Sequence, residues 1–312
     1  FSLSILDSGR SCITIVGEVV TMTALRVAGV LLTAFFFGIT FEGIGRKVTA
    51  RIQKRYGPPW YQNFIDLFKT LTKHGWTHGW IFDFGVLMAL GGVIATLSFV
   101  PLGNLVAFPG LDNFFVIVYL FTVGALGMAM GMVGTGNPWA SIGVARALTL
   151  MLGYEVPYLI TITSLLYFYR TSNITAIIQA QADGWNLFKF PIGALVAFIS
   201  LQGMLGKEPF EAPIAPSEIA SGPMVELSAK YMGLLMLMNS FMEFVEISLF
   251  VDFFLGGGTY FVFLLKYLIV WILAVMISSV LPRFRIEQAV AFYWTVPIIL
   301  AFVQAFIVVN LK

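Results

Sequence analysis

The sequence predicts an all-α polytopic membrane protein with about eight transmembrane helices and a short cytoplasmic amphipathic helix. Hydrophobic residues make up 59% of the 312 residues and charged residues only 11%, a composition outside the range of water-soluble domains. Apolar runs of about 18 residues or more, the length that crosses a bilayer, recur along the chain. No separable soluble part is visible, so we expect a single integral membrane domain covering residues 1–312.

Eight spans follow from these apolar runs. They cover residues 17–41, 84–103, 114–135, 144–169, 190–206, 229–255, 259–281 and 289–311. The fifth rises only about 25 Å as a helix, so it must stand nearly upright or begin earlier. The third contains Gly127 and Gly131 in a GxxxG pattern, which predicts close packing against another helix.

The basic residues predict the orientation in the membrane. Twelve of the 18 Lys and Arg residues lie in one set of alternate loops, and positively charged loops remain cytoplasmic. The cytoplasmic loops are therefore expected at residues 42–83, 136–147, 207–228 and 282–288. Both termini are then expected on the outer side of the plasma membrane. Separately, the start of the sequence lacks the pattern of a removable signal peptide, so none is expected.

The first of these loops is basic and contains a short amphipathic segment. A Gly-Pro-Pro turn follows the basic residues, and residues 63–73 place Phe64, Leu67, Phe68 and Leu71 on one side of a helix. Composition favours a segment that binds anionic lipid over one that docks a partner. His74 and His78 follow, but no third ligand is nearby, so a metal site is not expected.

Ionisable residues inside the predicted spans are the strongest functional signal. A charge near the bilayer centre costs at least about 2.5–3.5 kcal/mol, so it normally faces protein or water. Glu243 and Glu246 are three residues apart and share a helix face. Structural pairs, Glu18 with Arg26 or a sixth-span acid with Lys266, are one interpretation. A hydrated proton or ion path is favoured, because seven such groups occur: Glu18, Arg26, Glu155, Glu243, Glu246, Asp252 and Lys266.

An acidic, proline-rich loop separates two apolar runs at residues 207–222. Its sequence is KEPFEAPIAPSEIASG, with prolines at positions 209, 213 and 216 that prevent a regular helix. The carboxylates of Glu208, Glu211 and Glu218 are therefore held on a shaped loop. They are not displayed along a solvated helix face.

Composition also excludes several classes of protein. A net charge of +2 without a basic and aromatic patch gives no support for nucleic-acid binding. Cys12 is the one cysteine, so neither a disulfide framework nor a cysteine-ligated iron–sulfur cluster can be built from this chain alone. No metal, cofactor or catalytic residue is expected in the chain itself.

Five motifs in order resemble one known family. They are GRKVTARIQKRYGPP with Asp66 and Lys69 beyond it, GVARALTLMLGYEVP, EPFEAPIAPSEIASG with Glu226 beyond it, FLGGG, and LPRFRIEQ. Together they resemble the membrane subunit that forms the floor of the quinone site in respiratory complex I. They also resemble its counterparts in membrane-bound [NiFe]-hydrogenases and archaeal sulfane sulfur reductase complexes. The resemblance covers residues from about 40 to 290, and the eight-span count agrees with it.

Departures from the quinone-reducing pattern favour one branch of this family. Lys207 stands at an arginine position and Glu211 at an aspartate position of the quinone-type loop. Ile214 and Pro216 replace two further acids, and Ser278 replaces an arginine before LPRFR. The polar rim of a quinone site is thus reduced. The resemblance therefore implies the hydrogenase and sulfane reductase side, with ferredoxin as the electron donor.

The resemblance implies a non-catalytic subunit that docks a redox arm and passes its charge changes to proton or sodium translocation. Its partners would be antiporter-like membrane subunits and cytoplasmic subunits that hold iron–sulfur clusters and, in a hydrogenase, a nickel–iron centre. The docking residues would be Arg46, Lys47, Arg51, Arg55, Asp66, Arg146, Lys207, Arg283 and Arg285. The ion pathway would consist of Glu155, Glu211, Glu218, Glu226, Glu243, Glu246, Asp252 and Lys266.

Two alternatives remain open from the sequence. A quinone-binding subunit of a complex I-type oxidoreductase would show quinone reduction that quinone-site inhibitors block. A stand-alone secondary transporter would transport an ion or solute as an isolated chain in vesicles. Such transporters usually contain inverted repeats, and no repeat is visible here.

Overall fold

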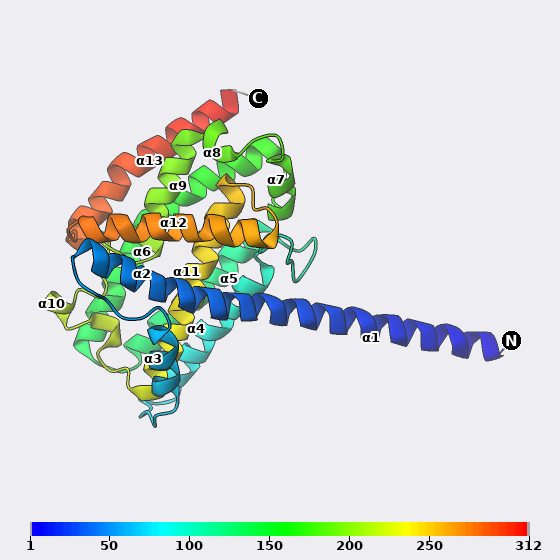
Figure 1. Cartoon of the computed structure of the whole chain (residues 1–312), viewed down its shortest axis with the longest axis horizontal. Helices are drawn as coiled ribbons and strands as arrows, with labels where there is room; N and C mark the ends of the chain where they lie inside the picture. Colours follow the sequence, from blue (N-terminus) through cyan, green and yellow to red (C-terminus); the bar gives the residue numbers. More distant parts are fainter. Residues whose placement is uncertain (1, 311–312) are drawn as a thin grey trace.

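The computed structural model is all-helical and confirms the predicted fold class (Figure 1). It describes the backbone of residues 2–310 and the side chains of residues 18–310 apart from Ser217. The predicted outer placement of the two chain ends, at Phe1 and Lys312, lies outside the described residues. The helices are α1 (Ser2–Thr33), η1 (Ala34–Gly38), α2 (Ile39–Ile52), α3 (Gln62–Leu71), α4 (Trp80–Phe99), α5 (Phe114–Val133), α6 (Pro138–Tyr169), α7 (Ile174–Ala180), α8 (Asn186–Lys189), α9 (Pro191–Met204), α10 (Pro216–Ile219), η2 (Gly222–Met224), α11 (Ala229–Phe254), α12 (Tyr260–Val280) and α13 (Ile286–Asn310).

Within the described part of the chain, seven helical segments are long and apolar enough to cross a membrane. The first of them runs without interruption from Glu18 to Ile52 through α1, η1 and α2. The remaining predicted span, the fifth at residues 190–206, corresponds to α9, which has only 14 residues. This length is below the roughly 20 residues that a perpendicular transmembrane helix needs, and it agrees with the short apolar run in the sequence.

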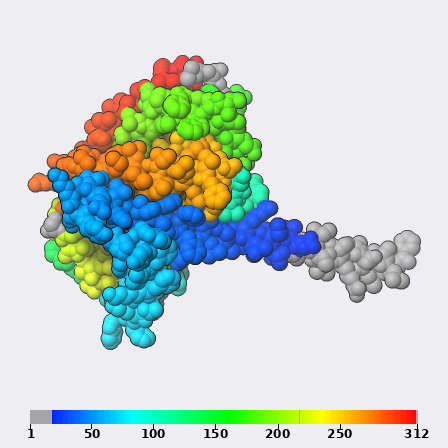
Figure 2. All heavy atoms as spheres, viewed as in Figure 1, coloured from blue at the N-terminus to red at the C-terminus, as the bar shows by residue number. Residues whose placement is uncertain are grey.

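The first helix extends further than the hydropathy pattern indicates. Residues 42–52 are expected to belong to a loop, but α2 continues through them as a regular helix. The π-helical segment η1 joins α1 to α2, and Gly38 at its end packs against α11. A Cβ at Gly38 would lie 2.8 Å from Ser240 Oγ, so a larger residue there would require the Ser240 side chain to move. The N-terminal part of α1 projects away from the other helices (Figure 1), and Figure 2 shows the described surface of the bundle from the same side.

Two glycine pairs allow α4 and α5 to pack at close range. A Cβ on Gly85 would overlap the backbone nitrogen of Gly131, and one on Gly92 would lie 2.6 Å from that of Gly124. Gly127 faces Ala89 in the same way. The GxxxG pattern therefore correctly predicts helix packing.

Helix α11 forms the centre of the molecule. Two thirds of its most apolar window is buried, a larger share than in any other described span. It contacts α2, α3, α4, α7, α9 and α12. The amphipathic helix α3 packs on it with Thr70 and Leu71 facing Gly233, whereas Phe68 is half exposed and contacts Phe35. Glu246 and Asp252 of α11 are therefore enclosed by protein.

A second packing group consists of α6, α9 and α13. α6 runs for 32 residues from Pro138, so most of the predicted loop at residues 136–147 is its first turns. Asn137 caps this helix by accepting a hydrogen bond from the Trp139 backbone, which explains why the helix begins before the apolar run. α6 packs along α13 and α9. A cavity remains where this group meets α11.

Candidate functional site

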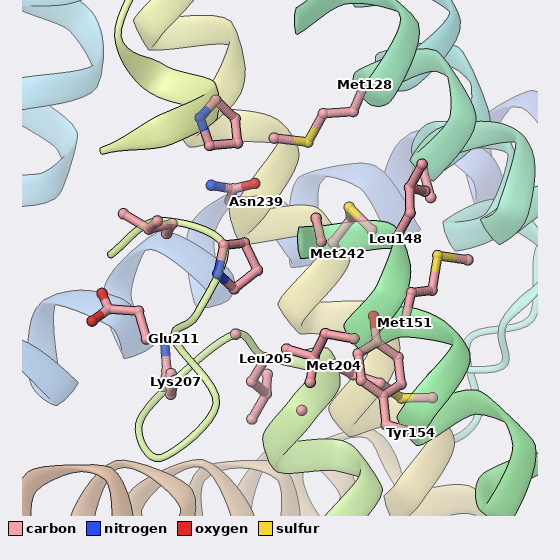
Figure 3. Close-up of a pocket in the computed structure, with 18 of the residues that line it drawn as sticks. Met128, Leu148, Met151, Tyr154, Met204, Leu205, Lys207, Glu211, Asn239 and Met242 are labelled. Atoms are coloured by element: carbon pink, nitrogen blue, oxygen red, sulfur yellow. The ribbon is translucent and has the colours of Figure 1, made fainter. Parts of the chain in front are cut away.

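A cavity of about 510 Å³ lies beneath the proline-rich loop. Its walls come from α5, α6, the end of α9, the loop itself and α11. Figure 3 shows Met128, Met151 and Tyr154 on one side and the loop residues Lys207 and Glu211 on the other. Six methionines line it: Met128, Met132, Met151, Met204, Met224 and Met242. Flexible methionine side chains tolerate changes of shape, so the apolar wall can adapt to different contents.

Polar groups gather on the loop side and the α11 side of this cavity, and Tyr154 of α6 lies on the opposite wall. The other polar groups are Lys207, Glu208, Glu211, Asn239, Glu243, Glu246 and Ser278. Glu243 and Glu246 both line the space, so they share a face of α11 as their spacing indicates. One carboxylate oxygen of each, Oε2, is buried without a hydrogen-bond partner among the described residues. The cavity therefore has one acidic side and one apolar side.

The side chain of Lys207 enters this acidic side. Its Nζ lies 2.8 Å from Glu243 Oε1 and 4.4 Å from the centre of the Trp271 ring. Trp271 is held in place by donating to the Phe41 carbonyl at 2.8 Å. Burial lowers the pKa of Lys207, but the nearby carboxylates, Glu243 foremost, raise it more, so the net shift is upward. Lys207 is thus a charged partner of the α11 acids.

Glu42 is an acid that sequence reasoning missed. It lies on α2, accepts a hydrogen bond from Asn63 Nδ2 at 3.1 Å, and contributes to the electrostatic potential at Lys207. Charged residues become frequent at this position, so the sequence predicts a loop there and Glu42 is not counted among the acids of a span. The helix in fact continues from the apolar run through residues 42–52, and extending the predicted helix would have identified Glu42.

Glu155 reaches the same region from α6. It lines a small cavity of about 30 Å³ together with Glu246, Tyr158 and Met204. A space of this size is large enough for a water molecule. The predicted pathway residues Glu155, Glu243 and Glu246 are therefore grouped around two neighbouring cavities.

The proline loop is anchored at its first half by aromatic and polar contacts. Phe210 packs on Tyr293 and Phe284, and the Phe284 backbone donates to the Pro209 carbonyl at 2.8 Å. Ser278 Oγ donates to Glu208 Oε2 at 2.7 Å. Burial raises the pKa of Glu211, and the neighbouring Glu208 raises it further. This carboxyl group is therefore sensitive to charge changes near the loop.

The second half of the loop is anchored by a shared ion pair. Glu218 accepts from Arg146 at 2.8 Å and from Arg283 at 3.0 Å. The hydrogen bond from Arg146 lowers the pKa of Glu218, and the charge of Arg283 lowers it further against the effect of burial. Arg146 comes from α6 and Arg283 from the turn before α13, so Glu218 joins the loop to both.

The remaining predicted residues lie in two other places. Glu226 is outside the cavity, where it accepts from Asn137 at 2.6 Å and lies 3.9 Å from His78 Nε2. Asp252 and Lys266 lie at the C-terminal end of α11 and the start of α12. Lys266 forms no ion pair with a sixth-span acid, and Glu18 forms none with Arg26, within the part of the chain that the structure describes.

The predicted docking residues other than Lys207 come from α2 and the segment after it, from α3, from α6 and from the turn before α13. We call this set the basic face: Arg46, Lys47, Arg51, Arg55, Asp66, Arg146, Arg283 and Arg285. Arg46, Lys47, Arg51, Arg55 and Arg285 are exposed, and Arg46 pairs with Asp66 at 3.2 Å. Among the described residues, no group of three or more His, Cys, Asp and Glu side chains is arranged to hold a metal ion.

Comparisons with known proteins agree with these features. The family model described as NADH dehydrogenase matches residues 25–309. A subunit of the F(420)H(2) dehydrogenase of Methanosarcina acetivorans is 30% identical, over 85% of this chain and 86% of that protein. A subunit of the NADH-quinone oxidoreductase of Brevibacillus brevis is 28% identical, over 86% of this chain and 88% of that protein.

A solved structure is also similar over nearly the whole chain. It is a chain of the membrane-bound sulfane sulfur reductase, an archaeal respiratory membrane complex. It superposes with a TM-score of 0.89 at 38% sequence identity, and the match covers 92% of this chain and 99% of that one. The resemblance inferred from the five motifs is thereby confirmed.

Proposed function

This chain belongs to the NADH dehydrogenase family of membrane subunits, and we propose that it is the membrane-anchoring and coupling subunit of a ferredoxin-linked respiratory complex. In this role it docks a cytoplasmic redox arm and passes charge changes in that arm to proton or sodium translocation. The observation that carries the proposal is the Lys207–Glu243 pair, because it connects the proline loop to the buried acids of α11.

Docking is assigned to the basic face. Exposed arginines and lysines beside a shaped loop suit a soluble partner with complementary acidic groups. Arg46, Lys47, Arg51, Arg55, Asp66, Arg146, Arg283 and Arg285 belong to this surface. Lys207 was expected there as well. We assign it instead to the charge relay, since its ammonium group is directed toward Glu243. The lipid bilayer and antiporter-like membrane subunits would surround the remaining helices.

The relay begins at the loop carboxylates and continues into the membrane. Electron arrival at a cluster above the loop would change the proton affinity of Glu211, Glu218 and Glu226 through the local electrostatic potential. Lys207 would transmit this change by strengthening or weakening its pair with Glu243. Glu246 and Glu155 would follow, since they share the small second cavity. Asp252 and Lys266 would form the far end of the path.

The ferredoxin-linked branch is supported by two observations. The sulfane sulfur reductase chain is 38% identical, compared with 28% and 30% for the quinone-linked and F(420)H(2)-linked relatives given above. The loop also lacks two of the acids of the quinone-type motif, at Ile214 and Pro216. Iron–sulfur clusters, and nickel if the complex is a hydrogenase, would be held by partner subunits.

A quinone-binding role is the second candidate, and the cavity favours it. A space of about 510 Å³ with an apolar wall and a few polar groups is typical of a small-molecule site. Quinone reduction by the purified complex, blocked by quinone-site inhibitors, would select this function. Absence of such activity with retained ferredoxin oxidation would exclude it.

One purification tests the proposal. The complex is isolated in mild detergent, its companion chains are identified, and bound nickel is measured. Ferredoxin-driven ion uptake into proteoliposomes supports the proposed function. Nickel with hydrogen evolution then selects a hydrogenase, and a nickel-free complex that consumes polysulfide selects the sulfur enzyme. Companion chains without iron–sulfur subunits would contradict the proposal.

A further inference from the structure

A second buried charged cluster lies apart from the cavity, at the C-terminal end of α11. Asp252 is 0% exposed, and neither oxygen of its carboxylate has a hydrogen-bond partner among the described residues. A buried carboxylate without donors is strongly unfavourable unless a proton or another cation neutralises it. A proton or a positively charged partner is therefore required at this position.

The obvious candidate for that partner, Lys266, is engaged elsewhere. Its Nζ donates to the carbonyl oxygens of Leu255 and Gly257, at 2.6 and 2.8 Å, and lies 4.8 Å from the centre of the Trp185 ring. It is not within 4.0 Å of either Asp252 oxygen. Lys266 therefore fixes the turn after α11 and leaves the carboxylate of Asp252 free for another ligand.

The turn itself lies directly against that carboxylate. Gly257 has φ +51°, and a Cβ there would lie 3.3 Å from Asp252 Oδ1. The turn also carries the carbonyl groups at the C-terminal end of α11, where the helix dipole is negative. Helix C-terminal ends and unwound carbonyls of this kind coordinate sodium in membrane transporters. The surroundings of Asp252 thus favour a small cation.

A second acid adds to the negative charge. Asp112 is 1% exposed, and its charge acts on Asp252. One of its oxygens accepts from the Thr175 backbone, whereas Asp112 Oδ1 and Thr175 Oγ1 are buried without partners in the described structure. When both carboxylates are ionised, they and the ammonium group of Lys266 leave a net charge of −1, which one monovalent cation balances.

From these observations we propose that Asp252 binds Na⁺ beneath the 255–258 turn, with Asp112 supplying the second negative charge and Lys266 holding the turn. Oxygen ligands of this type suit hard cations. Only the role of the bound ion in translocation rests on the proposed function, because Na⁺ binding does not require electron transfer through the complex.

Thermal stability of the intact complex in detergent tests the binding without any activity. NaCl replaces choline chloride at constant ionic strength, and the fraction of assembled complex is followed with temperature. As Na⁺ increases from about 1 to 100 mM, we expect the temperature at which half of the wild-type complex has disassembled to rise by about 2–4 °C. A ligand that binds the folded state stabilises that state. KCl should not produce this rise.

Variants identify the site. Asp252→Asn should abolish the rise, and Asp183→Asn, an exposed acid beyond α7, should preserve it. If Asp252→Asn does not assemble, Asp112→Asn is used and should raise the half-saturating Na⁺ concentration at least tenfold. A wild type that shows no sodium-specific rise overturns the proposal. So does an equal rise in Asp252→Asn, or an unchanged half-saturation in Asp112→Asn. A wild-type complex that binds sodium in this assay but does not pump ions would contradict the proposed function and leave the sodium site intact.

Discussion

Lys207 of the proline loop and Glu243 of α11 form an ion pair with a 2.8 Å separation at the wall of the cavity. Their side chains are 23% and 17% exposed, so both charges are largely removed from solvent. The two residues are 36 positions apart in the sequence. This pair is the direct contact between the loop beside the basic face and the acids inside the helical bundle.

Breaking this pair should destabilise the complex. Lys207→Gln leaves Glu243 buried without its cation, which costs up to about 3 kcal/mol. The double variant Lys207→Gln with Glu243→Gln should recover most of that loss, since no charge is then left unpaired. Lys207→Arg serves as the control that keeps the charge. Thermal stability of the purified complex measures the coupling, and additive losses in the double variant would show that the pair is not energetically coupled.

Glu155→Gln and Glu243→Gln should uncouple electron transfer from ion translocation. We expect ferredoxin oxidation to remain measurable while ion uptake per electron falls about tenfold or more, because a glutamine cannot accept a proton. Glu287→Gln, an exposed acid at the start of α13, is the matched control. Both rates are measured in proteoliposomes. Normal ion uptake in both variants would remove these residues from the pathway.

The Glu218 ion pairs should make the loop sensitive to acid. The pKa of Glu218 is lowered in the fold, so its stabilising effect is present above the ordinary value of 4.5 and is lost as the pH falls through the lowered value. Hydrogen exchange of residues 207–224, corrected for intrinsic rates, should therefore accelerate in that range. Glu218→Gln should exchange severalfold faster at neutral pH and lose this pH dependence. A variant loop that exchanges like the wild type at neutral pH would contradict the role of the pairs.

The glycine contact between α4 and α5 should be essential for folding. In Gly85→Ala the new methyl group would collide with the backbone of Gly131, and the helices would have to separate. We expect a loss of about 1–3 kcal/mol or failure to assemble. Gly91→Ala, on the same helix with open space around it, should be tolerated. Size-exclusion profiles of the two variants in detergent make the comparison, and equal assembly would refute the packing argument.

The helical segments and the family were predictable from the sequence because both depend on local information. Apolar runs identify spans whatever their neighbours are, and seven of the eight predicted spans correspond to long apolar helices. The GxxxG pattern indicated the α5 contact, and the spacing of Glu243 and Glu246 indicated their common face. Helix ends were less predictable, since α2 and α6 continue through charged or polar residues that hydropathy assigns to loops.

Only the tertiary structure decided which charges meet. Lys207 was expected on a docking surface, and the turn after α9 instead directs it to Glu243 and Trp271. Glu42 joins the same group because α2 remains helical, and Glu218 meets Arg146 and Arg283 because the loop crosses between α6 and α13. The sequence by itself determined the elements and their family. The rotation and crossing of the helices determined the pairs, because each pair joins segments that hydropathy treats as independent.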